Sequence, residues 1–264
     1  ILVQIVYRYL PFWPVFILLA GISLFVSYIY LRSQTKIYVA SAKVLIKDPN
    51  RGSESKVLDA MNIFTEKKSI ENEIIVLRSS KLMQEVVREL DLYATIYNQG
   101  NVQTEELYGI NSPVKFIAKD KYNISGVKKM YFSVDWKNGL VSIDDKKIPF
   151  GSTITVNQTE YTIVPNNQYN RNVVGKNFFV VFSTVARESS KIIGTLRASP
   201  MSYGSTALDV RIETPVPHKG VDVLNKLFEV YNNEAVEDKN IIAKNTLRFI
   251  DDRLDTVLNQ LDSV

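Results

Sequence analysis

One uncharged run near the N-terminus constrains this chain more than any other feature of its sequence. No charged side chain occurs from Leu10 to Leu31, and Arg8 and Arg32 flank the run. An α-helix over about 22 residues is roughly 33 Å long, enough to cross a bilayer core of about 30 Å. We therefore predict a transmembrane helix at residues 10–31, which would hold the rest of the chain at one membrane surface.

Two other interpretations of the run fit less well. A signal peptide has an apolar core of about 7–15 residues and ends at a small-residue cleavage site, whereas this run ends in bulky residues at 28–31. A buried helix of a soluble domain usually keeps a polar stripe, and this run has none. Trp13 at one end, with Tyr28 and Tyr30 at the other, is typical of the aromatic belts of membrane helices.

Small residues within the run indicate where another helix could pack. Ala20, Ser23 and Ser27 lie at helical spacing on one face, and small residues let helices approach closely in a membrane. We predict a packing stripe there, with a chance pattern of small residues as the alternative. The flanking charges do not predict orientation, because long domains translocate largely regardless of charge.

Composition excludes several function classes. The chain has no cysteine, so it has neither disulfides nor thiolate sites. Its net charge is only +4 and no block of basic residues occurs, so we expect no nucleic-acid partner. No glycine-rich phosphate loop is present either.

We predict no catalytic residue, no cofactor site and no metal site in these residues. The single histidine, His218, lies between Pro217 and Lys219 at the expected start of a helix. No serine or aspartate lies at the spacing of a catalytic motif with it. The acidic pairs Asp144-Asp145 and Asp251-Asp252 have basic neighbours, and we expect a solvated turn and a solvated helix face there. Most aromatic side chains occur at alternating positions and are expected to fill a core rather than stack on sugar.

Directly after the apolar run, the sequence predicts a strand, a loop and two short helices in turn. Residues 36–47 alternate in polarity and predict a strand, and polar residues then predict a loop up to about residue 68. Two short helices are expected next, one capped by Ser69 and the other by Ser79 or Ser80. Their apolar positions recur at helical spacing: Ile70, Ile74 and Leu77, then Leu82, Val86 and Leu90.

Residues 113–184 switch to period two and predict an antiparallel meander of short strands. Asn138-Gly139 and Asn157-Gln158 mark hairpin turns between them. The expected strands are Pro113–Lys119, Met130–Trp136, Leu140–Ile143, Thr153–Val156, Tyr161–Val164 and Phe178–Thr184.

The last part of the chain predicts a helix at 186–193, a strand at 207–213 and a long helix from near Lys219. Its apolar residues follow a 3-4-3-4 spacing, typical of either a coiled-coil seam or an amphipathic helix packed on its own domain. The seam residues are Leu247, Ile250, Leu254, Val257 and Leu261. Since the pattern runs to the last residue, we expect the helix to continue in the natural protein.

The predicted fold class is α+β: an N-terminal transmembrane helix, then a mixed α/β domain with an antiparallel sheet and a long C-terminal helix. We divide the chain into an N-terminal stub (1–9), the membrane helix (10–31), a first domain part (32–112), a strand-rich part (113–213) and the long helix (214–264).

Three stretches together carry a family resemblance. They are the post-anchor strand at 38–46, the segment IENEIIVLRS at 70–79, and residues 215 to about 261, where LNKLFEVY and FIDDRL occur. In this order the chain resembles the periplasmic domain of Wzz-type chain-length determinants, the polysaccharide co-polymerases. It is most similar to the subgroup fused to a cytoplasmic tyrosine autokinase, whose extra sheet the strand-rich part matches.

The resemblance implies a protein of the bacterial inner membrane, with a cytoplasmic N-terminus and residues 32–264 in the periplasm. It implies a ring-shaped homo-oligomer that regulates the length or export of capsular polysaccharide or exopolysaccharide. Its partners would be the membrane, a polysaccharide polymerase and an outer-membrane export protein. The family's second membrane helix and P-loop kinase are not present up to Val264.

Two other functions stay open from the sequence. A ligand-sensing ectodomain of a membrane receptor shares the order of anchor, domain and long helix. Such domains usually begin with a helix continuous with the first span, whereas a strand is expected here. A membrane-tethered hydrolase is the third reading, although the sequence contains no catalytic constellation for it.

Overall fold

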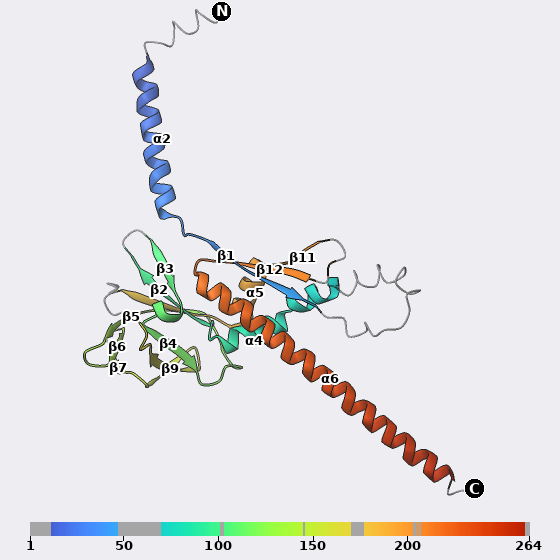
Figure 1. Ribbon diagram of the computed structural model, residues 1–264. Coiled ribbons are helices and arrows are strands. Elements are labelled where there is room, and N and C mark those ends of the chain that lie inside the picture. The colour runs from blue at the N-terminus through green and yellow to red at the C-terminus, as the bar shows by residue number, and fades with distance from the viewer. Residues whose placement is uncertain are drawn as a thin grey trace, which may run out of the picture.

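The computed structural model describes residues 12–46, 70–100, 103–144, 146–169, 177–202, 205 and 207–261, with only the backbone at 255–261. The loop expected at 48–68 and the cap expected at Ser69 lie outside these residues. Two long helices leave the folded domain on opposite sides (Figure 1). They are α2 (Trp13–Ser33) and α6 (Pro217–Leu261).

A three-stranded antiparallel sheet follows α2. Its order is β1-β12-β11, with β1 (Tyr38–Leu45), β12 (Ala207–Thr214) and β11 (Leu196–Pro200). Ala40 pairs with Ile212, and these two side chains lie on the buried face of the sheet. The alternation predicted for the strand after the anchor is thus confirmed, and β1 forms one edge of the sheet.

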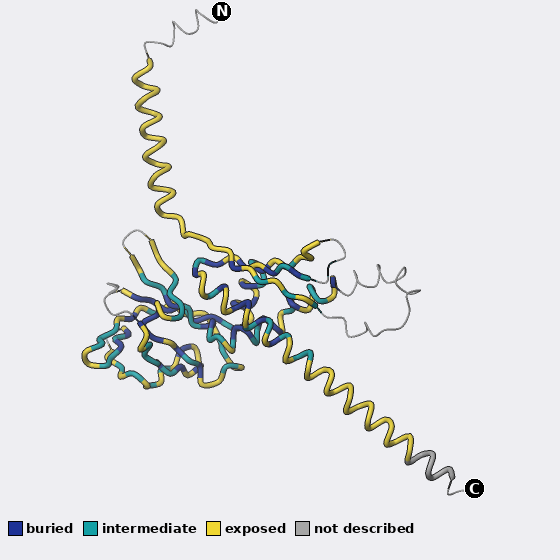
Figure 2. Tube along the Cα trace, viewed as in Figure 1, coloured by how far each residue is buried: buried dark blue, intermediate teal, exposed yellow. Residues whose placement is uncertain are grey.

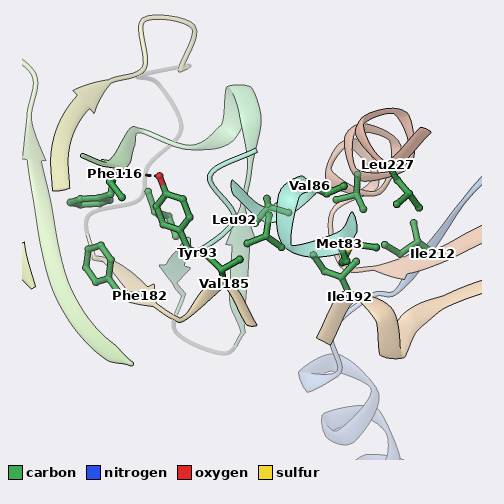
Figure 3. Close-up of a cluster of buried hydrophobic side chains, with 14 of the residues drawn as sticks. Met83, Val86, Leu92, Tyr93, Phe116, Phe182, Val185, Ile192, Ile212 and Leu227 are labelled. Atoms are coloured by element: carbon green, nitrogen blue, oxygen red, sulfur yellow. Dashed lines mark hydrogen bonds between the residues drawn. The ribbon is translucent and has the colours of Figure 1, made fainter. Parts of the chain in front are cut away.

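Helices cover the buried face of this sheet. They are α5 (Val185–Thr195) and the first turns of α6, and α4 (Ser80–Glu89) packs on both of them. Residues 70–77 form a further helical segment before α4. Ser79 caps α4, because its Oγ accepts a hydrogen bond from the Leu82 N–H at 3.4 Å. Thr184 caps α5 in the same way through the Arg187 N–H. Met83, Val86, Ile192, Ile212 and Leu227 meet between these elements (Figure 3).

The strand-rich part forms two further antiparallel sheets rather than the single meander that the sequence predicts. The larger sheet has the order β3-β2-β10-β5-β6-β7, and the smaller has the order β4-β9-β8. The larger comprises β2 (Ala94–Gln99), β3 (Thr104–Leu107), β5 (Lys128–Asp135), β6 (Leu140–Ile143), β7 (Lys146–Pro149) and β10 (Phe178–Phe182). The smaller comprises β4 (Val114–Ala118), β8 (Thr153–Val156) and β9 (Thr159–Pro165), and the 3-10 turn η2 (Gly109–Asn111) precedes β4.

Aromatic side chains join these two sheets, which explains the split. Phe116 of β4 packs edge-on against Phe132 and Phe182 of the larger sheet, at ring distances of 5.5 and 5.4 Å. The Tyr93 hydroxyl accepts a hydrogen bond from the Ala118 N–H at 2.9 Å (Figure 3). Apolar faces on both sets of strands are buried only when one set folds over the other.

Both predicted hairpin turns occur. Asn157 and Gln158 have φ angles of 50° and 69° and close the two-residue turn between β8 and β9. The turn at Asn138-Gly139 spans four residues, because β5 ends at Asp135 and pairs there with Leu140. The Asp135 carboxylate accepts hydrogen bonds from Asn138, which lowers its pKa.

Candidate functional site

The apolar helix α2 exposes all of its side chains to the surroundings. It is the one helix among the described residues that is long and apolar enough to cross a membrane. Figure 2 shows it exposed along its whole length, and Leu24 has 73% of its surface accessible. A helix that is apolar all round is stable only in lipid or against other helices.

The small-residue stripe lies on this exposed helix. Ala20, Ser23 and Ser27 are all exposed. The stripe therefore stays a prediction, because any partner for it would come from another helix.

The inner part of α6, from Pro217 to Tyr231, is built into the domain. Its apolar side chains at 223, 224, 227 and 230 are buried. At Gly220 the helix crosses the sheet so closely that an added Cβ would lie 2.9 Å from the Ala40 Cβ and 2.8 Å from a Thr214 methyl carbon. A glycine is required at this crossing because any side chain would collide with the sheet.

Polar contacts from distant parts of the chain fix the same part of α6. Lys219 forms a largely buried ion pair with Glu106 of β3. Near the other end, the Tyr231 hydroxyl donates a hydrogen bond of 2.6 Å to the Glu73 carboxylate. Burial, followed by the bond to Glu73, raises the pKa of the Tyr231 hydroxyl well above its ordinary value. This hydroxyl is therefore protonated and able to donate at neutral pH.

The outer part of α6 begins at Asn232. Glu234 still pairs with Lys81 of α4, and the helix beyond extends away from the domain (Figures 1 and 2). The predicted seam lies here, and its described members are open to solvent: Leu247 is 62%, Ile250 46% and Leu254 56% exposed. The side chains of Val257 and Leu261 lie outside the described set. The described seam side chains are therefore not buried against the domain, and the seam stays a prediction.

A second apolar stripe on the outer part was missed in the sequence analysis. Ile242 and Phe249 lie seven residues apart, so they share a face, and they are 65% and 69% exposed. In the heptad set by Leu247 and Ile250, this face points away from the seam. The i, i+7 spacing could have revealed it. The outer part therefore offers apolar surface in two directions.

The remaining candidates that the structure describes lie on separate elements. His218 is exposed in the first turn of α6, Asp144 lies in a turn, and Asp251 is on an open helix face. A half-open cavity of about 290 Å³ lies beside the inner part of α6, and two of its polar groups are paired with each other: Tyr108 bonds to Asp222. Within the described ranges, no three His, Asp or Glu side chains gather as a metal site requires.

Comparison with known proteins agrees with this architecture. Residues 10–90 match the family model of Wzz, the chain length determinant protein. A tyrosine-protein kinase, ptk, of Acinetobacter johnsonii is 20% identical over 274 aligned residues, which cover 95% of this chain. The chain is thus similar to Wzz-type proteins over residues 10–90, and to this kinase over most of its length. It spans 37% of the length of that curated relative, so the relative's kinase activity is a property of a much longer protein. The family match includes α2, β1 and α4, the first helices and the first strand of the described chain.

Proposed function

We propose that this chain is a membrane-anchored polysaccharide co-polymerase domain, which regulates the length or export of capsular polysaccharide or exopolysaccharide through homo-oligomeric assembly. In this proposal α2 spans the inner membrane with residues 1–9 in the cytoplasm, and residues 32–264 lie in the periplasm. The family match supports the polysaccharide role. The partners would be further copies in a ring, a polysaccharide polymerase and an outer-membrane export protein.

One observation carries the assembly part of the proposal. The outer part of α6 exposes the seam and, in a second direction, the stripe of Ile242 and Phe249. A lone apolar stripe is satisfied by a dimer, whereas two stripes on different faces suit a helix with a neighbour on each side. Such a helix fits a closed ring of many copies. The residues described here act as a scaffold in this proposal and carry out no reaction.

The length of the polysaccharide that cells produce tests the proposal. We expect the triple substitution of Leu247, Ile250 and Leu254 by Ser to change the length distribution of the extracted polysaccharide, because it removes the seam. The matched control replaces Asn245 and Arg248, exposed residues off the seam of the same helix, by Ser. An unchanged length distribution in the triple variant, with normal protein levels, would contradict the assembly role.

A further inference from the structure

We propose that the outer face of the three-stranded sheet rests on the anionic lipid headgroups of the bilayer that α2 crosses. The inference rests on the insertion of α2, which belongs to the proposed function. Side chains alternate along a strand, so the face opposite the buried one is defined by register. This outer sheet face comprises Val39, Ser41, Lys43 and Leu45 of β1, Arg197 and Ser199 of β11, and Asp209, Arg211 and Glu213 of β12.

The chain path turns this face toward the membrane. Only residues 34–37 separate α2 from β1, and an extended linker of that length spans at most about 14 Å. The Gln103 side chain donates a hydrogen bond of 3.0 Å to the Gln34 carbonyl, which ties the linker to the β2–β3 hairpin. Figure 1 shows α2 rising on one side of the sheet, with α4, α5 and α6 on the other.

The charges on and beside this face suit an anionic surface. Lys36 and Lys43 form no ion pair with any described residue. Among the described residues, the Arg197 guanidinium donates to the carbonyls of Gly194 and Leu196 and to no carboxylate, so no described residue neutralises its positive charge. Arg211 is paired with Asp209 of its own strand, and Glu213 is the second carboxylate on the face. With Lys43, Arg197 and Arg211 against Asp209 and Glu213, the basic side chains outnumber the acidic ones. Basic side chains close to a bilayer are attracted to anionic lipids within a Debye length.

Apolar side chains accompany these charges. Ile37 is 67%, Val39 60% and Leu45 63% exposed, and no described residue covers them. A surface that mixes accessible aliphatic and basic side chains suits the zone between headgroups and acyl chains, where both find partners. Since the face is continuous with the end of α2, the adjacent bilayer is the occupant that chain geometry brings nearest.

The absence of cysteine makes a site-specific test direct. We suggest single-cysteine variants of the full chain, each labelled with the environment-sensitive dye NBD and reconstituted in vesicles. The reporter is Ser41→Cys on the outer sheet face, and Leu24→Cys reports on α2. Thr155→Cys, exposed on β8 of the smaller sheet, is the control for nonspecific contact.

We expect NBD at position 41 to show a blue shift in equimolar phosphatidylcholine and phosphatidylglycerol. We expect no such shift in phosphatidylcholine alone. High ionic strength should reverse the shift, because the screening length falls from about 10 Å at 0.1 M to about 3 Å at 1 M salt. The double variant Lys43→Gln/Arg197→Gln should abolish it. The position 155 label should stay water-exposed throughout.

Three results would overturn the inference. Equal NBD emission from position 41 in both lipid mixtures would show that anionic headgroups do not bind this face. A blue shift that persists in the Lys43→Gln/Arg197→Gln variant would show the same. A blue shift that falls when the protein is diluted in the vesicles means that a protein neighbour, and not lipid, covers the face. The label at position 24 separates this failure from that of the anchor, since only loss of α2 insertion would leave it water-exposed in both mixtures.

Discussion

The inner and outer parts of α6 are one continuous helix in two opposite environments. The inner part buries Leu227 completely and is fixed to distant segments through Lys219 and Tyr231. The outer part leaves Leu247 and Phe249 open to solvent. Isolated helices are marginal in water, and most helical stability comes from packing. The comparison indicates that the inner part serves the fold of the domain and that the outer part is completed by something outside the described chain.

The largest expected effect on stability comes from making the same Leu→Ala substitution in the inner and in the outer part of α6. Leu227→Ala should lower the free energy of unfolding by about 2–5 kcal/mol, because it opens a cavity in a closed core. Leu247→Ala should change the stability of the unassembled domain by less than about 0.5 kcal/mol, since nothing covers it there. Urea unfolding of both variants in mild detergent measures the difference, and similar losses for the two would abolish the distinction.

The next effect tests the close crossing of α6 and the sheet. Gly220→Ala should destabilise the domain by about 1–3 kcal/mol, because the new methyl group overpacks against Ala40 and Thr214. The matched control is Gly194→Ala in the last turn of α5, where no atom lies within 4 Å of the added Cβ. Thermal unfolding followed by circular dichroism compares the two, and an unaffected Gly220→Ala melting curve would rule out the close approach.

A smaller effect is expected at the outer limit of the packed part. Tyr231→Phe should cost about 1 kcal/mol, because it leaves the Glu73 carboxylate without its donor. The burial that raises the pKa of Tyr231 in the fold makes this contribution pH-dependent. It is fully present below the ordinary pKa of 10.0 and is lost as the pH rises above it, since the unfolded chain then ionises first.

Stability measured at neutral pH and above pH 10 checks this prediction. The difference between wild type and Tyr231→Phe should shrink in alkali. Tyr122→Phe, at a ring that is 75% exposed, should show no difference at either pH. A Tyr231→Phe difference that is constant across this range would refute the donor role of the hydroxyl.

The smallest effect is expected where α6 leaves the surface of α4. Lys81 pairs with Glu234 at 2.8 Å, but its side chain is 84% exposed. Exposed ion pairs contribute little because water screens them. Lys81→Gln should therefore leave the unfolding curve unchanged, and a clear destabilisation would extend the packed part of α6 beyond Tyr231.

Much of the fold could be predicted because its signals are local. The membrane run, the Ser79 cap and the turn at Asn157-Gln158 each lie within a few residues, and each occurs as expected. Two of the strands that were missed carry weak patterns. β3 reads TEEL and β7 reads KKIP, and as edge strands they expose polar side chains that resemble a loop.

The contacts that position the candidate surfaces could not be read from the sequence. Lys219 and Glu106 are 113 residues apart, and Tyr231 and Glu73 are 158 apart, so no local pattern connects them. The separation of β4, β8 and β9 from the larger sheet likewise depends on which aromatic faces meet. By contrast, the seam and the Ile242–Phe249 stripe are helical repeats that the sequence contains in full.

In the proposed assembly, the outer part of α6 joins copies of this protein. The number of copies in each assembly tests this most directly. We suggest native mass spectrometry or cryo-electron microscopy of the full-length protein in lipid nanodiscs. The account predicts a ring of many copies for the wild type, and smaller species for the Leu247, Ile250 and Leu254 triple Ser variant with its domain still folded. A wild-type protein that stays monomeric or dimeric in the bilayer would contradict it.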